Sequence, residues 1–395
     1  MGTANYTRKE AAYIRNELLK AYLEPLFMLI GQREGRVCYI DCYSGPLEKG
    51  GRGLDDSSAA ISLAVMEKCH SALSEKFRKN VQFRGLYIER DKESFDRLQS
   101  FLESEAWSGS VDAHCLRGDF CDLQAEILSW CGNRDFCFFF VDATEWRHVA
   151  IPALEPFLVR SCSEFFINFM FDSIVRSHGQ TSFEEHVNAI FGKSLDISQI
   201  GLDEKERSLF NLYRQELKAS APIIEGQTPR CGHMKIFHPT KNRTVYDLLY
   251  LTWDPLRIVT FMDASEQLEI EQRKMRAVAR QSKKIKRTGQ LELFQADKFV
   301  EEEPAVDLAK VKQYWLANLL QTPKRFGVVE FADMLEETGW FMDDFQKAFL
   351  ELEHEGMVKN LASTGMRTGD PVRYWANGNR GEFLEKIEEK HAKSR

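Results

Sequence analysis

The sequence lacks the features that mark several large classes of protein. Its most apolar run, Phe136 to Val141, is far too short to cross a bilayer, which takes about 20 residues. It has no G-x-x-x-x-G-K-[ST] phosphate loop, which argues against an ATPase of that class. None of its nine cysteines forms a C-x-x-C pair, which argues against a zinc site. We therefore expect reduced cysteines, no bound metal and no membrane segment.

The sequence also lacks an excess of positive charge. Its net charge is −7, which argues against binding nucleic acid with the whole surface but leaves room for a local basic patch. The amino terminus is polar and has no signal-peptide pattern, so we expect a cytoplasmic protein.

What the sequence does have is a series of predicted strands that end at, or just before, an acidic residue. These acids are Asp41, Glu89, Asp119 and Asp142. Because the carboxyl ends of parallel strands meet at one edge of a sheet, the four acids are expected to face one crevice. The pattern predicts an α/β fold with a doubly wound, mostly parallel, Rossmann-like sheet. It also favours a cofactor rich in hydroxyl and amine groups over one rich in phosphate.

The first of these strands runs into a glycine turn, Ser44-Gly45-Pro46, and a helix is predicted to begin near Ser57. This arrangement can hold a nucleotide-like cofactor, or it can be the first core strand of any α/β domain. Glu89 is placed to accept hydrogen bonds from ribose, although its gap from Gly45 exceeds the usual ~20 residues. The alternatives are a solvated acid for Glu89 and a helix-capping turn residue for Asp119. The helix before the first strand is expected to cover the sheet without contributing chemistry.

The order of these motifs resembles the three-Cys-motif partner family (TcmP). The motifs that carry the resemblance are Asp41-Cys42-Tyr43-Ser44-Gly45-Pro46, Tyr87-Ile88-Glu89, Gly118-Asp119-Phe120, Asp142 with Trp146, Ile167-Asn168-Phe169-Met170 and Tyr250-Leu251-Thr252-Trp253-Asp254-Pro255. The resemblance covers roughly Arg8 to Phe294. It implies a class I S-adenosylmethionine-dependent methyltransferase fold, S-adenosylmethionine as cofactor, and a three-Cys-motif protein encoded nearby as partner.

The resemblance also implies roles for individual residues. Asp41 and Gly45 would form the turn on the methionine side, Glu89 would hold the ribose, and Asp119 would hold the adenine. The full set of expected cofactor-binding residues is Asp41, Ser44, Gly45, Pro46, Glu89, Asp119 and Phe120.

The expected catalytic residues are Asp142, Glu145 and Trp146. Amino-methylating enzymes have Asp-Pro-Pro-Tyr at this place, where the carboxylate accepts amine hydrogens and the aromatic ring stacks on the base. This chain keeps the acid and offers Trp146 for stacking, but it lacks the proline. Glu145 is interpreted either as a base or as a surface charge. Two hypotheses follow: a methyltransferase acting on nucleic acid, such as a base amino group, or a non-catalytic cofactor-binding partner that recruits another protein.

A basic and then acidic stretch, residues 271–305, is expected to link two domains. Its cations are the expected phosphate contacts, the alternative being a solvated helix end: Arg273, Lys274, Arg276, Lys283, Lys284, Lys286 and Arg287. The segment Gln290 to Phe294 resembles the peptide with which bacterial replication proteins bind the sliding clamp. Leu293 and Phe294 would then fill an apolar pocket.

The domain plan places a Rossmann-like domain at residues 1–270, with a helical insertion or lid at about 172–224. Residues 306–380 are predicted to form a winged helix, with wing strands at 356–360 and 372–375, and residues 381–395 a charged tail. The third helix of this domain, Met342 to Glu355, is acidic and would be repelled by phosphates. We therefore expect a protein contact or dimerisation at least as much as DNA recognition.

Overall fold

The computed structural model describes residues 3–45, 57–104, 107, 109–143, 145–170, 183–195, 205–241, 243–288, 306–363, 371–373 and 381–387. The chain divides into two compact units, Met1–Trp253 and Asp254–Arg395. The division precedes the expected boundary at residue 270, because the helix α9 (Pro255–Thr288) runs without a break through the first part of the expected linker. None of the helices among these residues is long and apolar enough to cross a bilayer.

The first unit is built on a seven-stranded sheet in the order β3-β2-β1-β4-β5-β7-β6. Its strands are β1 (Arg36–Asp41), β2 (Gln82–Glu89), β3 (Val111–Arg117), β4 (Phe136–Val141), β5 (Ser163–Phe169), β6 (Arg230–Phe237) and β7 (Thr244–Thr252). Neighbours from β3 to β5 pair in parallel, whereas β7 is antiparallel to both β5 and β6. This is the mostly parallel, Rossmann-like sheet that the sequence predicts.

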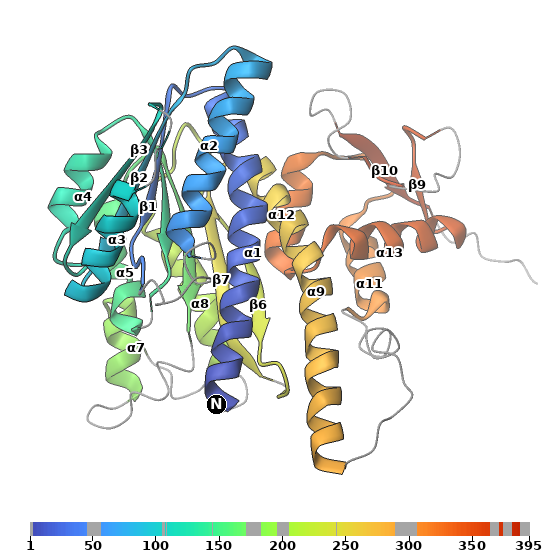
Figure 1. The fold of residues 1–395 in the computed structure, drawn as a ribbon. Helices are drawn as coiled ribbons and strands as arrows, with labels where there is room; N and C mark the ends of the chain where they lie inside the picture. Colours follow the sequence, from blue (N-terminus) through green and yellow to red (C-terminus); the bar gives the residue numbers. More distant parts are fainter. Residues whose placement is uncertain are drawn as a thin grey trace, which may run out of the picture. The chain divides into compact units, whose positions relative to one another are not determined.

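Helices cover both faces of this sheet (Figure 1). On one face lie α1 (Thr3–Gly31) and α2 (Ser58–Phe77). The Tyr22 ring of α1 packs against the Tyr250 ring of β7, with ring centroids 4.8 Å apart. The other face is covered by α4 (Gln124–Cys131), α5 (Ile151–Leu158), α7 (Phe183–Phe191) and α8 (Lys205–Ala219). Strands buried on both faces need apolar residues throughout, and every residue of β4 is buried.

The helices α7 and α8 fall within the expected insertion at residues 172–224. The sequence predicts a polar insertion or lid here. In the structure, however, the apolar residues of α7 and α8 belong to the core of the first unit. Val187 and Ile190 of α7, and Leu209 and Tyr213 of α8, are buried in the same cluster as the central strands. The Tyr213 hydroxyl also donates to the carbonyl of Val149 at 2.5 Å, which ties α8 to the edge of the sheet.

The described residues of the second unit, considered by itself, form α9, three shorter helices and a small antiparallel sheet in the order β8-β10-β9. After α9, its elements are α11 (Leu308–Asn318), β8 (Lys324–Phe326), α12 (Val328–Thr338), α13 (Met342–His354), β9 (Val358–Asn360) and β10 (Glu382–Lys386). Trp315 is fully buried among them and donates from Nε1 to the carbonyl of Phe345 at 2.9 Å. The helices α11, α12 and α13 lie where the sequence predicts the three helices of a winged helix, whereas β8 was not predicted.

The position of the last strand differs from the prediction. Residues 371–373 form no strand, and the central strand of the small sheet is β10, inside the segment expected to be a charged tail. The charge of Glu382 led to the prediction of a solvated tail, but its carboxylate is buried. Its Oε2 atom accepts from Asn360 Nδ2 at 2.7 Å and from the Arg373 amide at 2.8 Å.

Candidate active site

The carboxyl edge of the sheet gathers the four predicted acids. β1 to β4 run in parallel, and Asp41, Glu89, Asp119 and Asp142 lie at or just beyond the carboxyl ends of β1, β2, β3 and β4 respectively. The Asp142 carboxylate is close enough to Asp41 to raise the pKa of Asp41. The edge therefore carries a row of carboxylates, and their partners differ from one to the next.

The first acid, Asp41, is fully buried at the start of the glycine turn. Its Oδ1 atom accepts from the Tyr43 amide at 3.2 Å, whereas Oδ2 has no hydrogen-bond partner within the described part of the chain. The buried Ser44 hydroxyl also lacks a partner there. Gly45 has a φ of +67°, a left-handed conformation that glycine adopts without strain, while Pro46 lies outside the described residues.

The charge of Asp41 is unfavourable in this setting. Burial raises the pKa of Asp41 to about 7, with a smaller contribution from the nearby Asp142 carboxylate. Ser58, the Tyr43 amide and Arg15 lower the pKa without offsetting burial, and the Ser58 hydroxyl does not reach hydrogen-bonding geometry. A cation that docked beside Asp41 would stabilise its ionised form.

The last acid, Asp142, has partners for both carboxylate oxygens. Arg15 of α1 donates from Nη1 to Oδ2, and Asn168 at the end of β5 donates from Nδ2 to Oδ1 at 2.8 Å. Arg15 is held in turn by Asn16, whose Oδ1 accepts from Arg15 Nε and Nη2 at 3.1 and 3.0 Å. Burial alone would lower the pKa of Arg15, but the Asp142 carboxylate raises it above its ordinary value.

The contact of α1 with this edge was not predicted from the sequence. Ile14 and Leu18 mark its buried face, and Arg15 directly follows one of these positions. An arginine next to the buried face of a helix that covers the sheet indicates a contact with a buried acid. The sequence does not indicate which acid Arg15 contacts.

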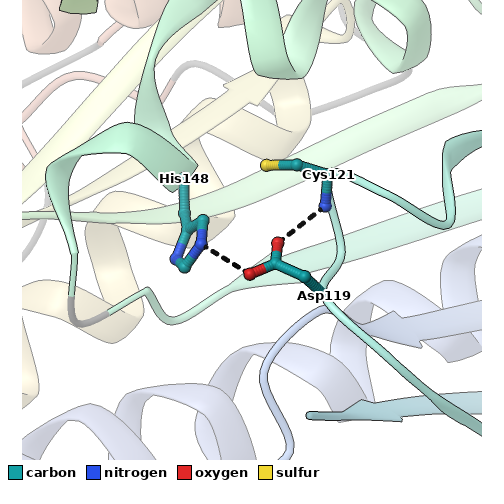
Figure 2. A group of neighbouring side chains, drawn as sticks. All are labelled: Asp119, Cys121 and His148. Carbon is teal, nitrogen blue, oxygen red and sulfur yellow. Dashed lines mark hydrogen bonds and ion pairs between the residues drawn. The ribbon is translucent and has the colours of Figure 1, made fainter.

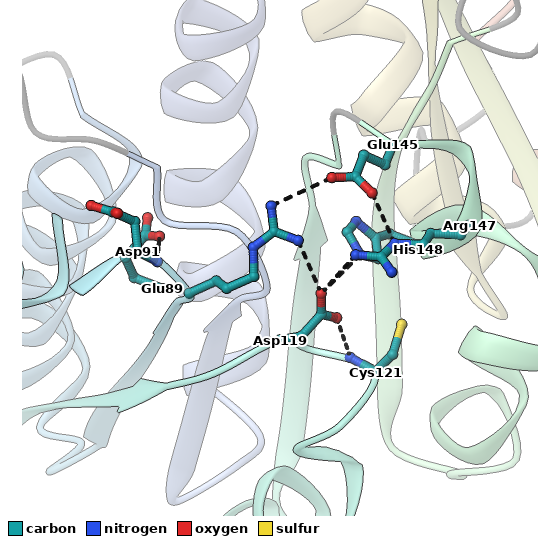
Figure 3. Close-up of polar contacts among 8 residues, drawn as sticks. Glu89, Asp91, Asp119, Cys121, Glu145, Arg147 and His148 are labelled. Carbon is teal, nitrogen blue, oxygen red and sulfur yellow. Dashed lines mark hydrogen bonds and ion pairs between the residues drawn. The ribbon is translucent and has the colours of Figure 1, made fainter. Parts of the chain in front are cut away.

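Asp119 lies in a cluster of donors (Figures 2 and 3). Its Oδ1 accepts from the Cys121 amide at 3.0 Å, and its Oδ2 lies 3.2 Å from both Arg147 Nη2 and His148 Nε2 and 3.5 Å from Arg90 Nη1. Burial alone would raise the pKa of Asp119, but these partners outweigh burial and hold it below its ordinary value. Asp119 is thus an ionised acid that already has its counter-charges.

His148 belongs to the short helix η1 (Trp146–Val149), which follows β4. Burial lowers the pKa of His148 against the opposing effect of Asp119, so the neutral ring donates from Nε2. The ring stacks on Tyr43 with centroids 4.7 Å apart, and Nδ1 is buried with no partner among the described residues. Its position 29 residues beyond Asp119 gave no sequence signal of this contact.

Asp119, Cys121 and His148 each place one possible metal-ligand atom within 4.8 Å of the other two, as Figure 2 shows. The electrostatics oppose a cation there. Burial raises the pKa of the Cys121 thiol to about 11, so the thiolate that a metal needs is costly to form. Arg90 and Arg147 also bring two positive charges to the same carboxylate.

The remaining predicted residues of the first unit have mixed surroundings. Glu89 accepts from the Asp91 amide at 2.7 Å, and Glu145 is ion-paired with Arg147 at 2.8 Å and with Arg90 at 3.4 Å. Trp146 lies edge-on to His186 of α7, with ring centroids 5.1 Å apart, and packs partly into the core. Phe120 is a core residue, stacked on Phe157 with centroids 4.9 Å apart.

The expected phosphate contacts lie on α9, in the second unit. Arg273 is paired with Glu269 at 3.2 Å, and Arg276 is buried. Lys274 and Lys283 are exposed. The side chains of Lys284, Lys286 and Arg287, and the whole segment 290–294, lie outside the described residues.

Comparison with known proteins identifies no family for this chain. No family model matches it, and no curated protein matches its sequence. Among solved structures, it is similar to protein LPL1258 from Legionella pneumophila, assigned to the DUF519 family model, with a TM-score of 0.38 and 10% identity over 65% of this chain and 91% of that chain. It is also similar to a putative O-methyltransferase from Klebsiella pneumoniae, with a TM-score of 0.32 and 14% identity over 59% of this chain and 78% of that chain. The plantazolicin methyltransferase BpumL, solved in complex with SAH, gives a TM-score of 0.31 and 15% identity over 63% of this chain and 87% of that chain.

Proposed function

We propose that this chain is an S-adenosylmethionine-dependent methyltransferase whose cofactor lies along the carboxyl edge of the first unit's sheet. The observation that carries the proposal is the end of β1 in the Rossmann-like sheet. There Asp41 and Ser44 are buried beside a left-handed glycine, and Asp41 Oδ2 and Ser44 Oγ have no hydrogen-bond partner among the described residues. Buried polar atoms are nearly always hydrogen-bonded, so unpartnered acceptors at a ligand-binding edge favour a donor-bearing ligand. The α-ammonium of the methionine end fits this requirement.

The other strand-end residues can take up the rest of the cofactor. Glu89 would accept hydrogen bonds from the ribose hydroxyls, and Asp119 would accept one from the adenine amino group. The bound cofactor would supply the methyl group, and the chain would hold it and orient the target. Asp142, beyond β4, would then accept a hydrogen from the target amine.

The finer proposal is that the target is a nucleic acid. Its support is the exposed pair Lys274 and Lys283 on α9, together with the motif resemblance to the three-Cys-motif partner family. The same resemblance suggests a three-Cys-motif protein as partner. Clamp binding through residues 290–294 can coexist with this role, and unchanged clamp pull-down after Leu293 and Phe294 are replaced by Ala would remove it.

A second candidate is a non-catalytic partner that binds the cofactor and recruits another protein through the second unit. The observation that favours it is the state of Asp142, whose two oxygens are held by Arg15 and Asn168. The position of Trp146 also favours this candidate, because its ring packs against His186 instead of being free to stack on a base.

The experiment that tests the proposal is calorimetric titration of the full chain with S-adenosylmethionine, followed by transfer of a labelled methyl group to DNA and RNA pools. The Glu89→Gln variant should bind the cofactor roughly 10-fold more weakly, because it loses hydrogen bonds to a charged group. Glu93→Gln is the matched control, since Glu93 is an exposed acid at the start of α3 (Lys92–Ser104) that pairs with Arg97. Absence of binding by folded protein would reject the proposal, and binding without transfer would favour the second candidate.

A further inference from the structure

Asp142 carries its own counter-ion, Arg15, whereas the proposed methyl transfer to an amine would need a free carboxylate there. Arg15 and Asn168 occupy the two oxygens that would accept hydrogens from a target amine. The side chains of Arg15 and Asp142 are only 19% and 16% exposed, so the pair is largely shielded from water. Separating such a pair is costly unless each freed charge finds another partner.

Buried acceptors without donors surround this ion pair. Asp41 Oδ2, Ser44 Oγ and Asn168 Oδ1 have no hydrogen-bond partner among the residues that the structure describes. Asp41 and Ser44 lie at the end of β1 and Asn168 lies near the end of β5, while β4, which leads to Asp142, runs between these two strands. The acceptors therefore flank Asp142 on both sides, where a ligand rich in donors would satisfy them.

The cofactor proposed above ends in an α-amino acid, which brings both signs of charge. Its ammonium has three N–H donors and suits the free acceptors of Asp41 and Ser44. Its carboxylate needs a cation. The Arg15 guanidinium donates to Asp142 and is close enough to Asp41 to lower the pKa of Asp41. A planar guanidinium is also the group best suited to bind a carboxylate.

We propose that Arg15 binds the carboxylate at the amino-acid end of the cofactor and, in doing so, releases Asp142. This inference rests on the proposed function. Asn16 already holds Arg15 through Nε and Nη2, so the exchange requires only Nη1 to change partner. Asp142 then keeps Asn168 and has one oxygen free for the target amine. The acid becomes competent only after the cofactor has bound, which imposes an order of binding.

The test compares two probes that differ in the amino-acid end, titrated calorimetrically into the full chain. S-adenosylhomocysteine has this end, whereas 5′-methylthioadenosine lacks it. Arg15→Gln should lower the affinity for S-adenosylhomocysteine by roughly 10–100-fold, the value of one charge-assisted contact. Its affinity for 5′-methylthioadenosine should stay within about 2-fold, because that probe does not reach Arg15. Lys20→Gln is the matched control on α1, since Lys20 forms an ion pair with Glu17 of the same helix at 2.9 Å, and it should change neither affinity.

A second variant tests the exchange itself. Asp142 competes with the cofactor carboxylate for Arg15, so Asp142→Asn should raise the affinity for S-adenosylhomocysteine by about 3–10-fold. The affinity for 5′-methylthioadenosine should not change. A residue that merely braced the edge of the sheet would produce the opposite result, with both probes bound more weakly.

Each outcome has one meaning. If Arg15→Gln weakens both probes equally, Arg15 is structural and the inference is wrong, while the proposed function stands. If Asp142→Asn weakens S-adenosylhomocysteine binding, Arg15 and Asp142 hold the ligand together and the exchange is wrong. If the folded wild-type chain binds neither probe, both the proposed function and this inference are wrong.

Discussion

Asp41 and Asp119 follow strands of the same parallel sheet, but the chain treats their charges in opposite ways. Asp41 is fully buried, has an unpartnered oxygen in the described part of the chain, and burial raises its pKa to about 7. Asp119 is surrounded by Arg90, Arg147, His148 and an amide, and its pKa lies below the ordinary value. A positive ligand beside Asp41 would stabilise its ionised form, whereas a ligand at Asp119 would have to share donors that are already in place.

The comparison predicts opposite effects on stability when each carboxylate becomes an amide. The pKa of Asp41 is raised above its unfolded value of about 4, so folding is penalised as pH rises from about 4 to 7, and the penalty is complete above pH 7. Asp41→Asn should therefore stabilise the cofactor-free chain at pH 8 by on the order of 2–4 kcal/mol, and by much less at pH 4.5. Denaturant unfolding at the two pH values measures this effect.

Asp119→Asn should act in the other direction. Its lowered pKa means that ionised Asp119 contributes stability above pH 4, which is lost as pH falls through the folded pKa. The loss at pH 8 should be only about 1 kcal/mol, because Arg90 and Arg147 are more than half exposed and their attraction is screened. If both variants shifted stability in the same direction, the contrast between the two acids would be refuted.

The same contrast predicts how cofactor affinity depends on pH. An ammonium beside Asp41 requires the ionised carboxylate, so below pH 7 binding must release a proton. Affinity for S-adenosylhomocysteine should therefore rise by up to about 10-fold per pH unit between pH 5 and 7, and then level off. Titrations in two buffers of different ionisation enthalpy would count the released proton. The Asp119→Asn variant should keep the same profile, and a profile that followed Asp119 instead would contradict the assignment.

The sequence predicted the sheet well because the physics of β4 and its neighbours is local. A strand buried on both faces must be apolar, and an acid just past its end is easy to recognise. The partners of those acids could not be predicted in the same way. His148 reaches Asp119 through a short helix, and Arg15 reaches Asp142 from the far end of the unit's sequence. Such contacts depend on tertiary packing, which no short motif records.

In the second unit, too, a contact between residues distant in the sequence was not predicted. Glu382 was interpreted as part of a charged tail because charge usually indicates solvent. It is buried in the central strand of the small sheet, where Asn360 and a backbone amide satisfy it. A charge whose partner is distant in the sequence looks the same, in the sequence, as a charge exposed to water.

The cations of α9 also differ in whether a side chain of the protein pairs with them. We expect smaller effects from their replacement than from replacement of the acids. Lys274 and Lys283 are exposed, whereas Arg273 is held by Glu269 and only 18% exposed. If α9 contacts phosphates, replacing both lysines by Gln should weaken DNA or RNA binding about 3–10-fold. It should also reduce the slope of log affinity against log salt by roughly 1.4–1.8, because each of the two phosphate contacts contributes roughly 0.7–0.9. Arg273→Gln is the matched control and should leave the slope unchanged, since its charge is already paired. Fluorescence anisotropy over a salt series measures both quantities, and an equal loss of slope in the Arg273 variant would show that burial in α9 does not decide which cations meet the phosphates.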